Sequence, residues 1–415
     1  MNNKRVVVTG MGAITPIGIG VDDTWKALLA GRSGVRTITS FDVTDFATQF
    51  AAQVTDFDAN DYMDFREARR TARFTQYAVA ATHEAIQDSG LDLAKEELTR
   101  VGVQMGTAIG GVDIITQQTI VFHEKGYRRV NPVLIPELLA NSGACHIAIK
   151  LGIRGPTESP VAACATGVVA VGQALRLLQR GEADVMLAGG SEYATTPLGI
   201  AAFGRIGVLS TYNEDPPRAC RPFDAQRDGT VMGEGAAVLV METLQHAVQR
   251  NAPILAEVLG YATTEDAHHI AAPDPSGDGA ARAISLALTD AHVSPVEIDY
   301  IAPHGTGTPL NDLSETRACK AVFGERAYRI PISSNKSMVG HMFGGAGAIS
   351  SIVAILAMRD GIVPPTLNLD HPDPDCDLDY VPNQARKVRV DTAIVNAFGF
   401  GGQNATAVFR RADAL

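Results

Sequence analysis

The feature that most constrains this chain is the alternation of short apolar runs with longer amphipathic stretches. Runs typical of buried strands lie at Val101–Met105, Val185–Ala188, Ala236–Met241, Ile254–Val258, Tyr300–Ile301, Ile330–Ser333 and Ala393–Asn396. Stretches with helical spacing lie between them, at Glu67–Gln87, Val168–Gln179, Ala280–Ala291, Leu313–Phe323 and Ala348–Met358. This alternation predicts an α/β fold whose largely parallel strands are covered by helices on both faces.

A weak internal similarity suggests that the chain contains a duplication. Residues 160–190 run from small residues into an amphipathic helix and then a strand, and residues 333–366 run from Ser-Ser-Asn-Lys through a glycine-rich turn into a long apolar helix. Two related halves, 1–250 and 251–415, would explain this similarity, although chance explains it equally well. No long linker or low-complexity tract separates the two halves, so we expect them to share one core.

Composition excludes several classes of protein. The chain has 415 residues, 46% of them hydrophobic, and a net charge of −11, which argues against nucleic acid as the main partner. No uninterrupted run of 18 apolar residues appears, so no membrane span is predicted. The start, MNNKRVVVTG, lacks the layout of a signal peptide, and the five cysteines are widely spaced. These features predict a reduced, cytoplasmic protein.

The glycines near the N-terminus suggest a nucleotide cofactor only superficially. Gly10-Met-Gly12 resembles the beginning of a dinucleotide-binding fingerprint, but Thr15 stands where the third glycine belongs. Pro16 would also interrupt the helix that should hold the pyrophosphate. We therefore expect a tight turn after a strand here, and no cofactor.

Cys164 is the cysteine with a setting suited to catalysis. It lies in Val161-Ala-Ala-Cys-Ala-Thr-Gly, between a strand-like approach and a predicted helix. The positive end of the helix dipole would lower the pKa of the thiol and favour the thiolate. Backbone N–H groups at this turn could also hold an oxyanion. The plain alternative, a buried small hydrophobic residue, is equally compatible with the local sequence.

Two histidines lie in glycine-flanked loops after predicted strands. His304 begins His-Gly-Thr306-Gly-Thr308, and His341 ends Lys336-Ser-Met-Val-Gly-His. The threonines are two residues apart, so their hydroxyls can face one side of an extended loop and meet an amide-bearing ligand. Lys336, if it lies near the histidines, would suppress their protonation. On its own, Lys336 could equally be a solvated loop charge.

One thiol and two histidines suggest acyl chemistry on a thioester. The cysteine can accept an acyl group, and two neutral imidazoles can donate hydrogen bonds to a developing enolate oxygen. A metal site is the other chemistry that such residues allow. No pair of candidate ligands has a short spacing such as HxxxH, so we predict no metal.

Together these motifs resemble the β-ketoacyl-acyl carrier protein synthases, in the type I/II branch of the thiolase superfamily and closest to its synthase II group. The resemblance rests on the Cys164 turn, the His304 loop, Lys336 to His341, and Asn396-Ala-Phe-Gly-Phe400-Gly-Gly, and it extends over nearly the whole chain. It implies a thiolase-like five-layer αβαβα fold with two duplicated halves. The N-terminal half, 1–250, would hold Cys164, and the C-terminal half, 251–415, would hold the histidines.

The resemblance also implies roles for single residues. Cys164 matches the acyl-accepting nucleophile, His304 and His341 the pair that supports decarboxylation and condensation, Lys336 the lysine beside them, and Phe400 the gating phenylalanine. The backbone N–H groups of Cys164 and Phe400 would form the oxyanion hole. Further matches concern substrate binding. Thr306 and Thr308 match the threonines that contact the pantetheine arm, and Ile109 and Phe203 match positions that line the acyl pocket, with residues near Val133 and Leu134 reaching across a dimer. Glu315 matches the acidic residue in the network of Lys336.

A basic cluster suits an acidic carrier protein. Arg66, Arg69, Arg70 and Arg73 follow i, i+3, i+4 and i+7 spacing, so on one helix they would share a face. Such a face would steer an acidic partner, although a plain solvated face has the same appearance. Arg205 is a further docking candidate, since Gly207 stands where the family often has a basic residue.

The expected activity is the decarboxylative condensation of acyl- and malonyl-acyl carrier protein by a homodimer, elongating fatty acids without a cofactor, nucleic acid or membrane. Some residues depart from the family pattern, namely Ser350 in place of a glutamate near a structural cation site, Glu158 and Pro160. A pathway-specific ketosynthase, for a polyketide or a specialised acyl chain, therefore stays open. A non-catalytic chain-length partner is disfavoured by Cys164. A biosynthetic thiolase is disfavoured because Cys376, the last cysteine, lies in an acidic loop.

Overall fold

The computed structural model describes residues 4–414. Its N-terminal half forms a five-stranded sheet in which β5 and β7 run parallel while β8 is antiparallel to both of its neighbours. The strand order across this sheet is β6 (Thr157–Glu158), β5 (Val101–Gly106), β7 (Val185–Glu192), β8 (Gly235–Thr243) and β1 (Val6–Thr15).

The C-terminal half repeats this order and these directions. Its strands are β10 (Tyr300–Ala302), β13 (Thr392–Gly399), β14 (Gln403–Arg411) and β9 (Ala256–Glu265), and a parallel bridge from Ile301 to Ile332 stands where β6 stands in the first half. The two sheets join where β1 pairs with β9 at Val7 and Val8. The predicted duplication of halves is therefore confirmed in the topology, whereas the boundary after residue 250 stays a prediction.

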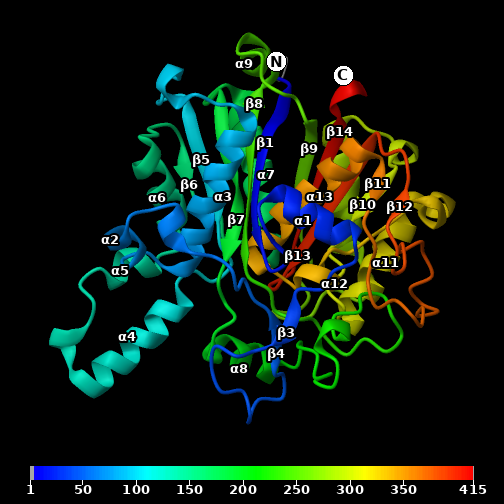
Figure 1. The fold of residues 1–415 in the computed structure, drawn as a ribbon. Helices are drawn as coiled ribbons and strands as arrows, with labels where there is room; N and C mark the ends of the chain where they lie inside the picture. Colours follow the sequence, from blue (N-terminus) through cyan, green and yellow to red (C-terminus); the bar gives the residue numbers. More distant parts are fainter. Residues whose placement is uncertain (1–3, 415) are drawn as a thin grey trace.

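Helices complete five layers (Figure 1). The helices α3 (Arg73–Ser89) and α6 (Ser142–Leu151) cover the outer face of the first sheet, and α10 (Asp278–Ala291) and α11 (Pro309–Phe323) that of the second. Between the sheets lie α7 (Thr166–Arg180) and α13 (Ala346–Asp360), which contact strands of both halves. This arrangement confirms the αβαβα fold that the resemblance implied. The prediction of largely parallel strands is wrong, because most strand pairs of the large sheet are antiparallel.

The central helices explain why one apolar segment is so long. Phe343–Asp360 has the length and mean hydropathy, 1.3, to cross a membrane, but 89% of it is buried inside the protein. Its side chains belong to the large central core, together with α7 and residues of both sheets. A helix covered on all sides needs apolar residues all round, so this composition reflects the middle layer of the fold.

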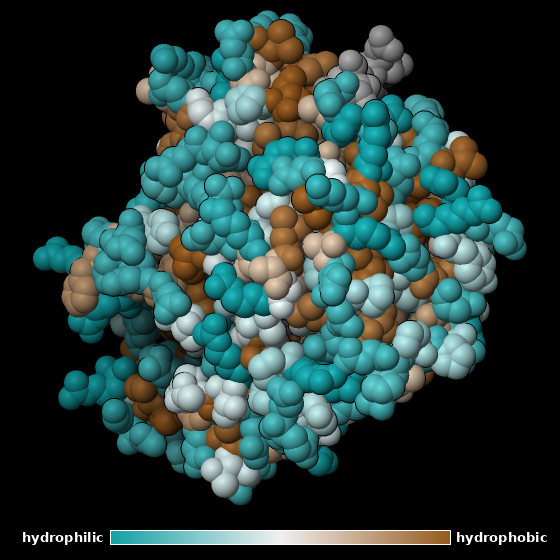
Figure 2. Space-filling model, turned by 45° about the vertical axis from the view of Figure 1, so that its right-hand side comes forward, coloured by the Kyte–Doolittle hydropathy of each residue, from teal (hydrophilic) through white to brown (hydrophobic). Residues whose placement is uncertain are grey.

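The remaining elements are short or peripheral. They are α1 (Val21–Leu29), α2 (Phe65–Ala68), α4 (Val112–Lys125), α5 (Leu134–Leu138), α8 (Pro197–Ile206), α9 (Leu244–Gln249), α12 (Lys336–Val339), β2 (Gly18–Ile19), β3 (Val35–Thr37), β4 (Phe50–Ala52), β11 (Ile362–Val363) and β12 (Arg386–Lys387). On the face in Figure 2, hydrophilic side chains predominate and apolar ones lie scattered among them.

The predicted helix over Glu67–Gln87 is wrong at its N-terminal end. The chain leaves α2 after Ala68 and enters α3 at Arg73, with Ala72 in an extended conformation. Polar side chains stabilise this break: Gln76 donates to the carbonyls of Ala68 and Thr71. Local spacing of apolar residues did not reveal the break because these bonds form only once the two segments pack.

Glycines let the two central helices approach closely where the functional residues meet. A Cβ on Gly167, in α7, would lie 2.5 Å from the backbone nitrogen of Ala348, and one on Gly347, in α13, would lie 2.6 Å from that of Val168. Only glycine permits this approach. The crossing places the N-terminal ends of α7 and α13, one from each half, side by side.

Candidate active site

Cys164 lies at the end of α7 that meets α13. It is buried in a 3-10 turn, Ala163–Ala165, that leads directly into α7. Ala163 has a positive φ of 46°, which non-glycine residues rarely adopt. Phe343 has the same unusual conformation, with a φ of 43°, at the corresponding turn before α13. Each half therefore builds the same sharp turn, and the first half places a cysteine on it.

The two candidate histidines lie next to this thiol. The sulfur of Cys164 and ring nitrogens of His304 and His341 all lie within 4.8 Å of one another. The two imidazole rings are perpendicular, at an angle of 82°, with centres 5.4 Å apart. His304 follows β10, and His341 follows α12, so the structure brings together three residues that are far apart in the sequence.

Hydrogen bonds define which nitrogen of His341 carries the proton. The backbone N–H of Phe343 donates to Nδ1 of His341 over 3.3 Å, so Nδ1 accepts and Nε2 carries the hydrogen of the neutral ring. Among residues 4–414, neither Nε2 of His341 nor Nδ1 of His304 has a partner, although both atoms are buried. These two nitrogens are therefore available to a ligand.

Both histidines are neutral at physiological pH. Burial lowers the pKa of each ring well below 6.5, and the Lys336 ammonium lowers it further. Lys336 is itself buried at the start of α12, where burial lowers its pKa and the Glu315 carboxylate opposes that shift. Two neutral imidazoles suit hydrogen-bond donation to a developing anion.

The prediction of a thiolate at Cys164 is wrong for the resting protein. Burial raises the pKa of the Cys164 thiol to about 12, and this outweighs the Lys336 charge and the backbone N–H of Phe400, which both favour the thiolate. The helix terminus by itself would favour the thiolate. Removal of water by the packed halves is the larger effect, since it penalises the charged form.

We expect alkylation of Cys164 by iodoacetamide to accelerate about tenfold per pH unit up to pH 10, without a plateau. The reason is that the thiolate fraction keeps rising while the pH stays below a pKa of about 12. The measurement is the inactivation rate between pH 6 and 10, with modification at Cys164 verified by peptide mass spectrometry. A plateau below pH 8 would show that the helix terminus outweighs burial.

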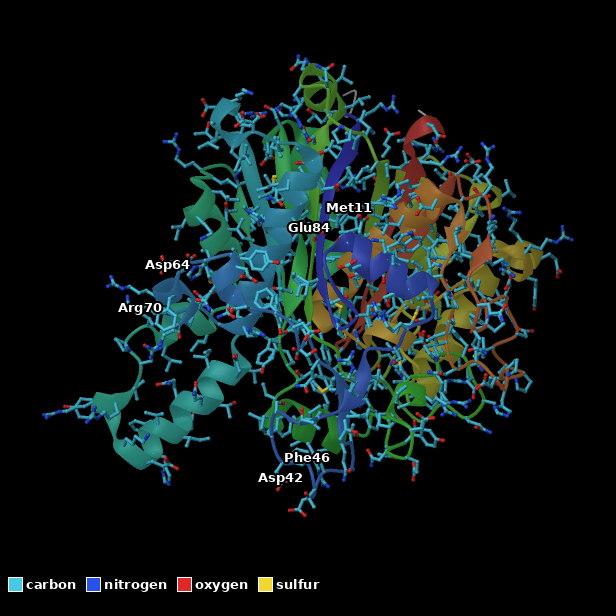
Figure 3. All side chains as sticks on the ribbon, viewed as in Figure 1. Met11, Asp42, Phe46, Asp64, Arg70 and Glu84 are labelled. Carbon is cyan, nitrogen blue, oxygen red and sulfur yellow. The ribbon has the colours of Figure 1, made fainter. Side chains whose placement is uncertain are left out.

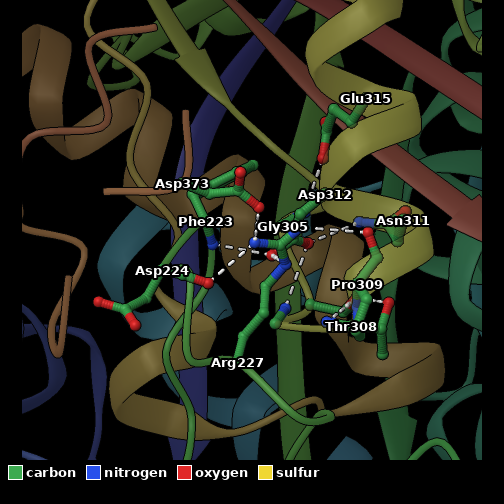
Figure 4. Close-up of polar contacts among 12 residues, drawn as sticks. Phe223, Asp224, Arg227, Gly305, Thr308, Pro309, Asn311, Asp312, Glu315 and Asp373 are labelled. Carbon is green, nitrogen blue, oxygen red and sulfur yellow. Dashed lines mark hydrogen bonds and ion pairs between the residues drawn. The ribbon is translucent and has the colours of Figure 1, made fainter. Parts of the chain in front are cut away.

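Two buried acids hold the His304 loop in place (Figure 4). The Glu315 carboxylate accepts the backbone N–H groups of His304 and Gly305, over 2.8 and 2.7 Å. Asp312, one turn earlier on α11, accepts that of Gly307 over 3.2 Å and lies 3.5 Å from the Arg227 guanidinium. The α11 carboxylates thus fix the loop that presents His304, Thr306 and Thr308.

This geometry corrects the substrate-binding role predicted for Glu315. Its carboxylate is fully buried, is engaged by backbone N–H groups and by Asn396, and does not line the cavity described below. Glu315 is a positioning residue. Ile109 also lies outside that cavity; its side chain is 41% exposed in this single chain.

A cavity of about 310 Å³ leads to the thiol and the histidines. Thr306 and Thr308 line it, and their hydroxyls lie 3.0 Å apart on the same side of the loop. Phe400 and Phe203 line it as well, with ring centres 6.2 Å apart. The structure therefore places five of the predicted site residues around one space, together with His304 and His341.

The predicted arginine face is wrong as a helical face, because the break between α2 and α3 separates its members. Arg66, Arg69 and Arg70 are exposed around α2, and Figure 3 shows Arg70 at the edge of the molecule. Arg73 instead packs over the rings of Phe57 and Tyr77. Arg205 is exposed on α8, two residues before Gly207, which lines the cavity.

Sequence reasoning missed part of the site. The segment Asp228–Thr230 lines the cavity, and Arg227 beside it supports the His304 loop. No local signal marks these residues, because an arginine in a polar loop is ordinarily solvated. Ser350, which departs from the family pattern, is buried and accepts a hydrogen bond from Asn335 over 3.2 Å.

Comparison with known proteins finds relatives that all belong to one family, the beta-ketoacyl synthases. Residues 3–247 match the model of the beta-ketoacyl synthase N-terminal domain, and residues 255–370 match that of the C-terminal domain. The chain is 48% identical to 3-oxoacyl-[acyl-carrier-protein] synthase 2 of Synechocystis sp. and 46% identical to that of Coxiella burnetii, each over 99% of both chains.

A solved structure of the same shape supports the fold assignment. It is described as a type II polyketide synthase acyl-carrier protein in complex with its ketosynthase, and it superposes with a TM-score of 0.92 at 36% identity, covering 99% of this chain and 100% of the other. The five-layer arrangement is thus the thiolase-like ketosynthase fold that the sequence predicted.

Proposed function

This chain belongs to the beta-ketoacyl synthase family, and we propose that it condenses acyl- and malonyl-acyl carrier protein to 3-oxoacyl-acyl carrier protein in fatty acid elongation. The observation that carries this proposal is the meeting of Cys164, His304 and His341 at one cavity. The reaction would make the protein an acyltransferase. Its nucleophile needs a reduced thiol, which suits a cytoplasmic location; cell fractionation would test this.

The first step loads the acyl group onto Cys164. Since burial keeps the thiol protonated, the attack needs a base. The lone pair on Nδ1 of His341 is engaged by Phe343, so we assign proton acceptance to His304. The new sulfur–carbon bond forms as the carrier's thioester bond breaks, and the departing pantetheine sulfur takes the proton from His304.

The second step uses the histidines as donors. The malonyl carbon–carbon bond breaks, carbon dioxide leaves, and the electron pair moves onto the thioester oxygen as an enolate. The Nε2–H of His341, together with a donor on neutral His304, stabilises that oxygen. The enolate carbon attacks the acyl carbonyl, whose oxygen is held by the N–H groups of Cys164 and Phe400. The bond to Cys164 then breaks, and its sulfur takes a proton from solvent.

A metal centre is the other chemistry open to a thiol and two imidazoles this close. The charge environment favours the nucleophile instead. Lys336 acts on both rings and on the thiol as a positive charge in a buried site, which disfavours binding of a divalent cation. No metal therefore enters the proposed reaction.

The experiment that tests the proposal is mass spectrometry of the protein after incubation with acyl-carrier proteins of rising chain length, and then with malonyl-carrier protein. We expect an acyl adduct on Cys164 that is discharged as a 3-oxoacyl product. A specialised ketosynthase is a second candidate, since the structural relative belongs to a polyketide synthase. Loading by a polyketide carrier, with none by fatty acyl carriers, would favour it over fatty acid elongation.

Docking of the carrier protein is expected to depend on the exposed arginines. Replacing Arg66, Arg70 and Arg205 together with glutamate should raise KM for the acyl-carrier protein about tenfold or more and change kcat little, because the arginines lie outside the cavity. Steady-state kinetics at low and high salt measure this effect. The matched control is Arg282→Glu, at an exposed position on α10. An equal effect in the control would contradict the assignment.

We propose a homodimer from an unpartnered apolar region. The segment 109–161 holds many of the exposed large apolar side chains, including Ile120, Phe122, Ile135 and Ile149, and it contains the edge strand β6. No residue of α4 is buried, and this helix stands away from the body in Figure 1. A second copy would cover this surface. Analytical ultracentrifugation should give twice the chain mass of 43.8 kDa, and Phe122→Glu should shift the distribution towards the monomer.

A further inference from the structure

Thr230 is a polar residue of the cavity that the mechanism has not used. It is 4% exposed and lines the cavity together with the thiol and both histidines. Its hydroxyl is buried and has no hydrogen-bond partner among residues 4–414. Leaving such a group unpaired is unfavourable, so native proteins rarely do so. Nε2 of His341, the donor that the mechanism uses, is also buried without a hydrogen-bond partner among these residues.

The backbone places Thr230 beside His341. Thr230 pairs with the 208–210 segment, donating its N–H to the carbonyl of Val208 over 2.8 Å. The next residue, Val231, accepts the N–H of His341 over 2.7 Å. The side chain of Val231 packs into a separate apolar cluster, so that of Thr230 faces the opposite way, towards the cavity.

The cavity that Thr230 lines also holds Thr306, Thr308 and the two histidines, and Phe203, matched to the acyl pocket, lines it as well. Since Val231 accepts a hydrogen bond from the backbone of His341, the hydroxyl of Thr230 lies on the part of the cavity near the histidines, to which the carrier arm would bring the malonyl group. The proposed reaction brings two oxygen-bearing groups of the malonyl unit there: the thioester carbonyl, which the histidines hold, and the carboxylate, which still needs a donor.

We propose that the Thr230 hydroxyl donates a hydrogen bond to the carboxylate of the malonyl group and so selects the extender unit; this rests on the proposed function. The bond holds the carboxylate before decarboxylation. Because the negative charge leaves the carboxylate as the carbon–carbon bond breaks, the bond is strongest in the bound substrate and weaker in the transition state. Thr230 is thus a specificity-determining residue for binding, with little effect on the chemical step.

The test compares Thr230→Val, which keeps the shape and removes the hydroxyl, with Thr230→Ser, which keeps the hydroxyl. With Cys164 already acylated, Thr230→Val should raise KM for malonyl-carrier protein roughly 10- to 100-fold, the worth of a hydrogen bond to a charged group, while kcat stays within about twofold or rises. Thr230→Ser should restore most of the affinity. Inhibition by acetyl-carrier protein, which lacks the carboxylate, should be the same in all three proteins.

Two results would overturn the inference: an unchanged KM for malonyl-carrier protein in Thr230→Val, or an equal loss of affinity for acetyl-carrier protein, which would indicate a packing role. Acyl loading of Cys164 is measured in parallel on the unaltered protein and on both variants. Failure of the unaltered protein to load would count against the proposed function, whereas normal loading with an unchanged malonyl KM would count against Thr230 alone.

Discussion

Replacing Cys164 with alanine is expected to lower condensation by on the order of 10³-fold or more, because no other thiol can take the acyl group at this cavity. The other cysteines do not line the cavity. The measurement is 3-oxoacyl product formed from acyl- and malonyl-carrier protein, together with the acyl adduct by mass spectrometry. Near-normal condensation by this variant would overturn the mechanism.

Cys220 supplies the matched control for that experiment. It is buried like Cys164, and burial likewise raises the pKa of its thiol to about 12, but it belongs to a separate apolar cluster and does not line the cavity. Cys220→Ala should therefore keep both the adduct and the product. The Cys164→Ala protein should also keep the decarboxylation of malonyl-carrier protein, because its histidines are unchanged. Loss of that activity would point to a general disturbance of the site.

Replacing His304 or His341 with alanine is expected to lower malonyl decarboxylation by about 10²–10³-fold, the usual effect of removing a donor to a developing oxyanion. The Nε2–H of His341 is preset by the bond from Phe343, so its loss should affect this step most selectively. Release of carbon dioxide from labelled malonyl-carrier protein measures the step. Acyl transfer to Cys164, measured separately, should fall less, and more in the His304 variant than in the His341 variant.

A histidine outside the cavity controls for folding. His146, in α6, is half-buried, and burial lowers its pKa too. His146→Ala should leave both half-reactions unchanged. If the two active-site variants slowed acyl transfer and decarboxylation to the same extent, the division of roles between the histidines would be wrong.

The glycine-rich loops show which features of the site can be predicted from local sequence. Cys164, His304 and His341 were identifiable because each lies in a turn or loop with small residues, next to a predicted strand or helix. Such patterns depend on neighbours a few residues away, so the sequence contains them completely. The alternation of strands and helices is local in the same way, and it predicted an α/β fold; the five layers were implied by the resemblance.

The Arg66–Arg73 segment shows the opposite case. Its spacing indicates one helical face, but side-chain bonds from Gln76 to Ala68 and Thr71 stabilise a break, and Arg73 turns to the rings of Phe57 and Tyr77. Glu315 was likewise expected at the substrate, and it supports the His304 loop instead. Both outcomes depend on packing partners that the local pattern does not contain.

The sequence by itself thus determined the family of the fold and the identity of the reacting groups, since both follow from short-range periodicity and from motifs. The tertiary structure decided the state of those groups. The pKa values of Cys164 and the two histidines, the proton position on His341 and the unpaired hydroxyl of Thr230 all result from burial between two halves that are distant in the chain. The desolvation of a group depends on all the atoms that surround it in space, so it is set only once the chain has folded.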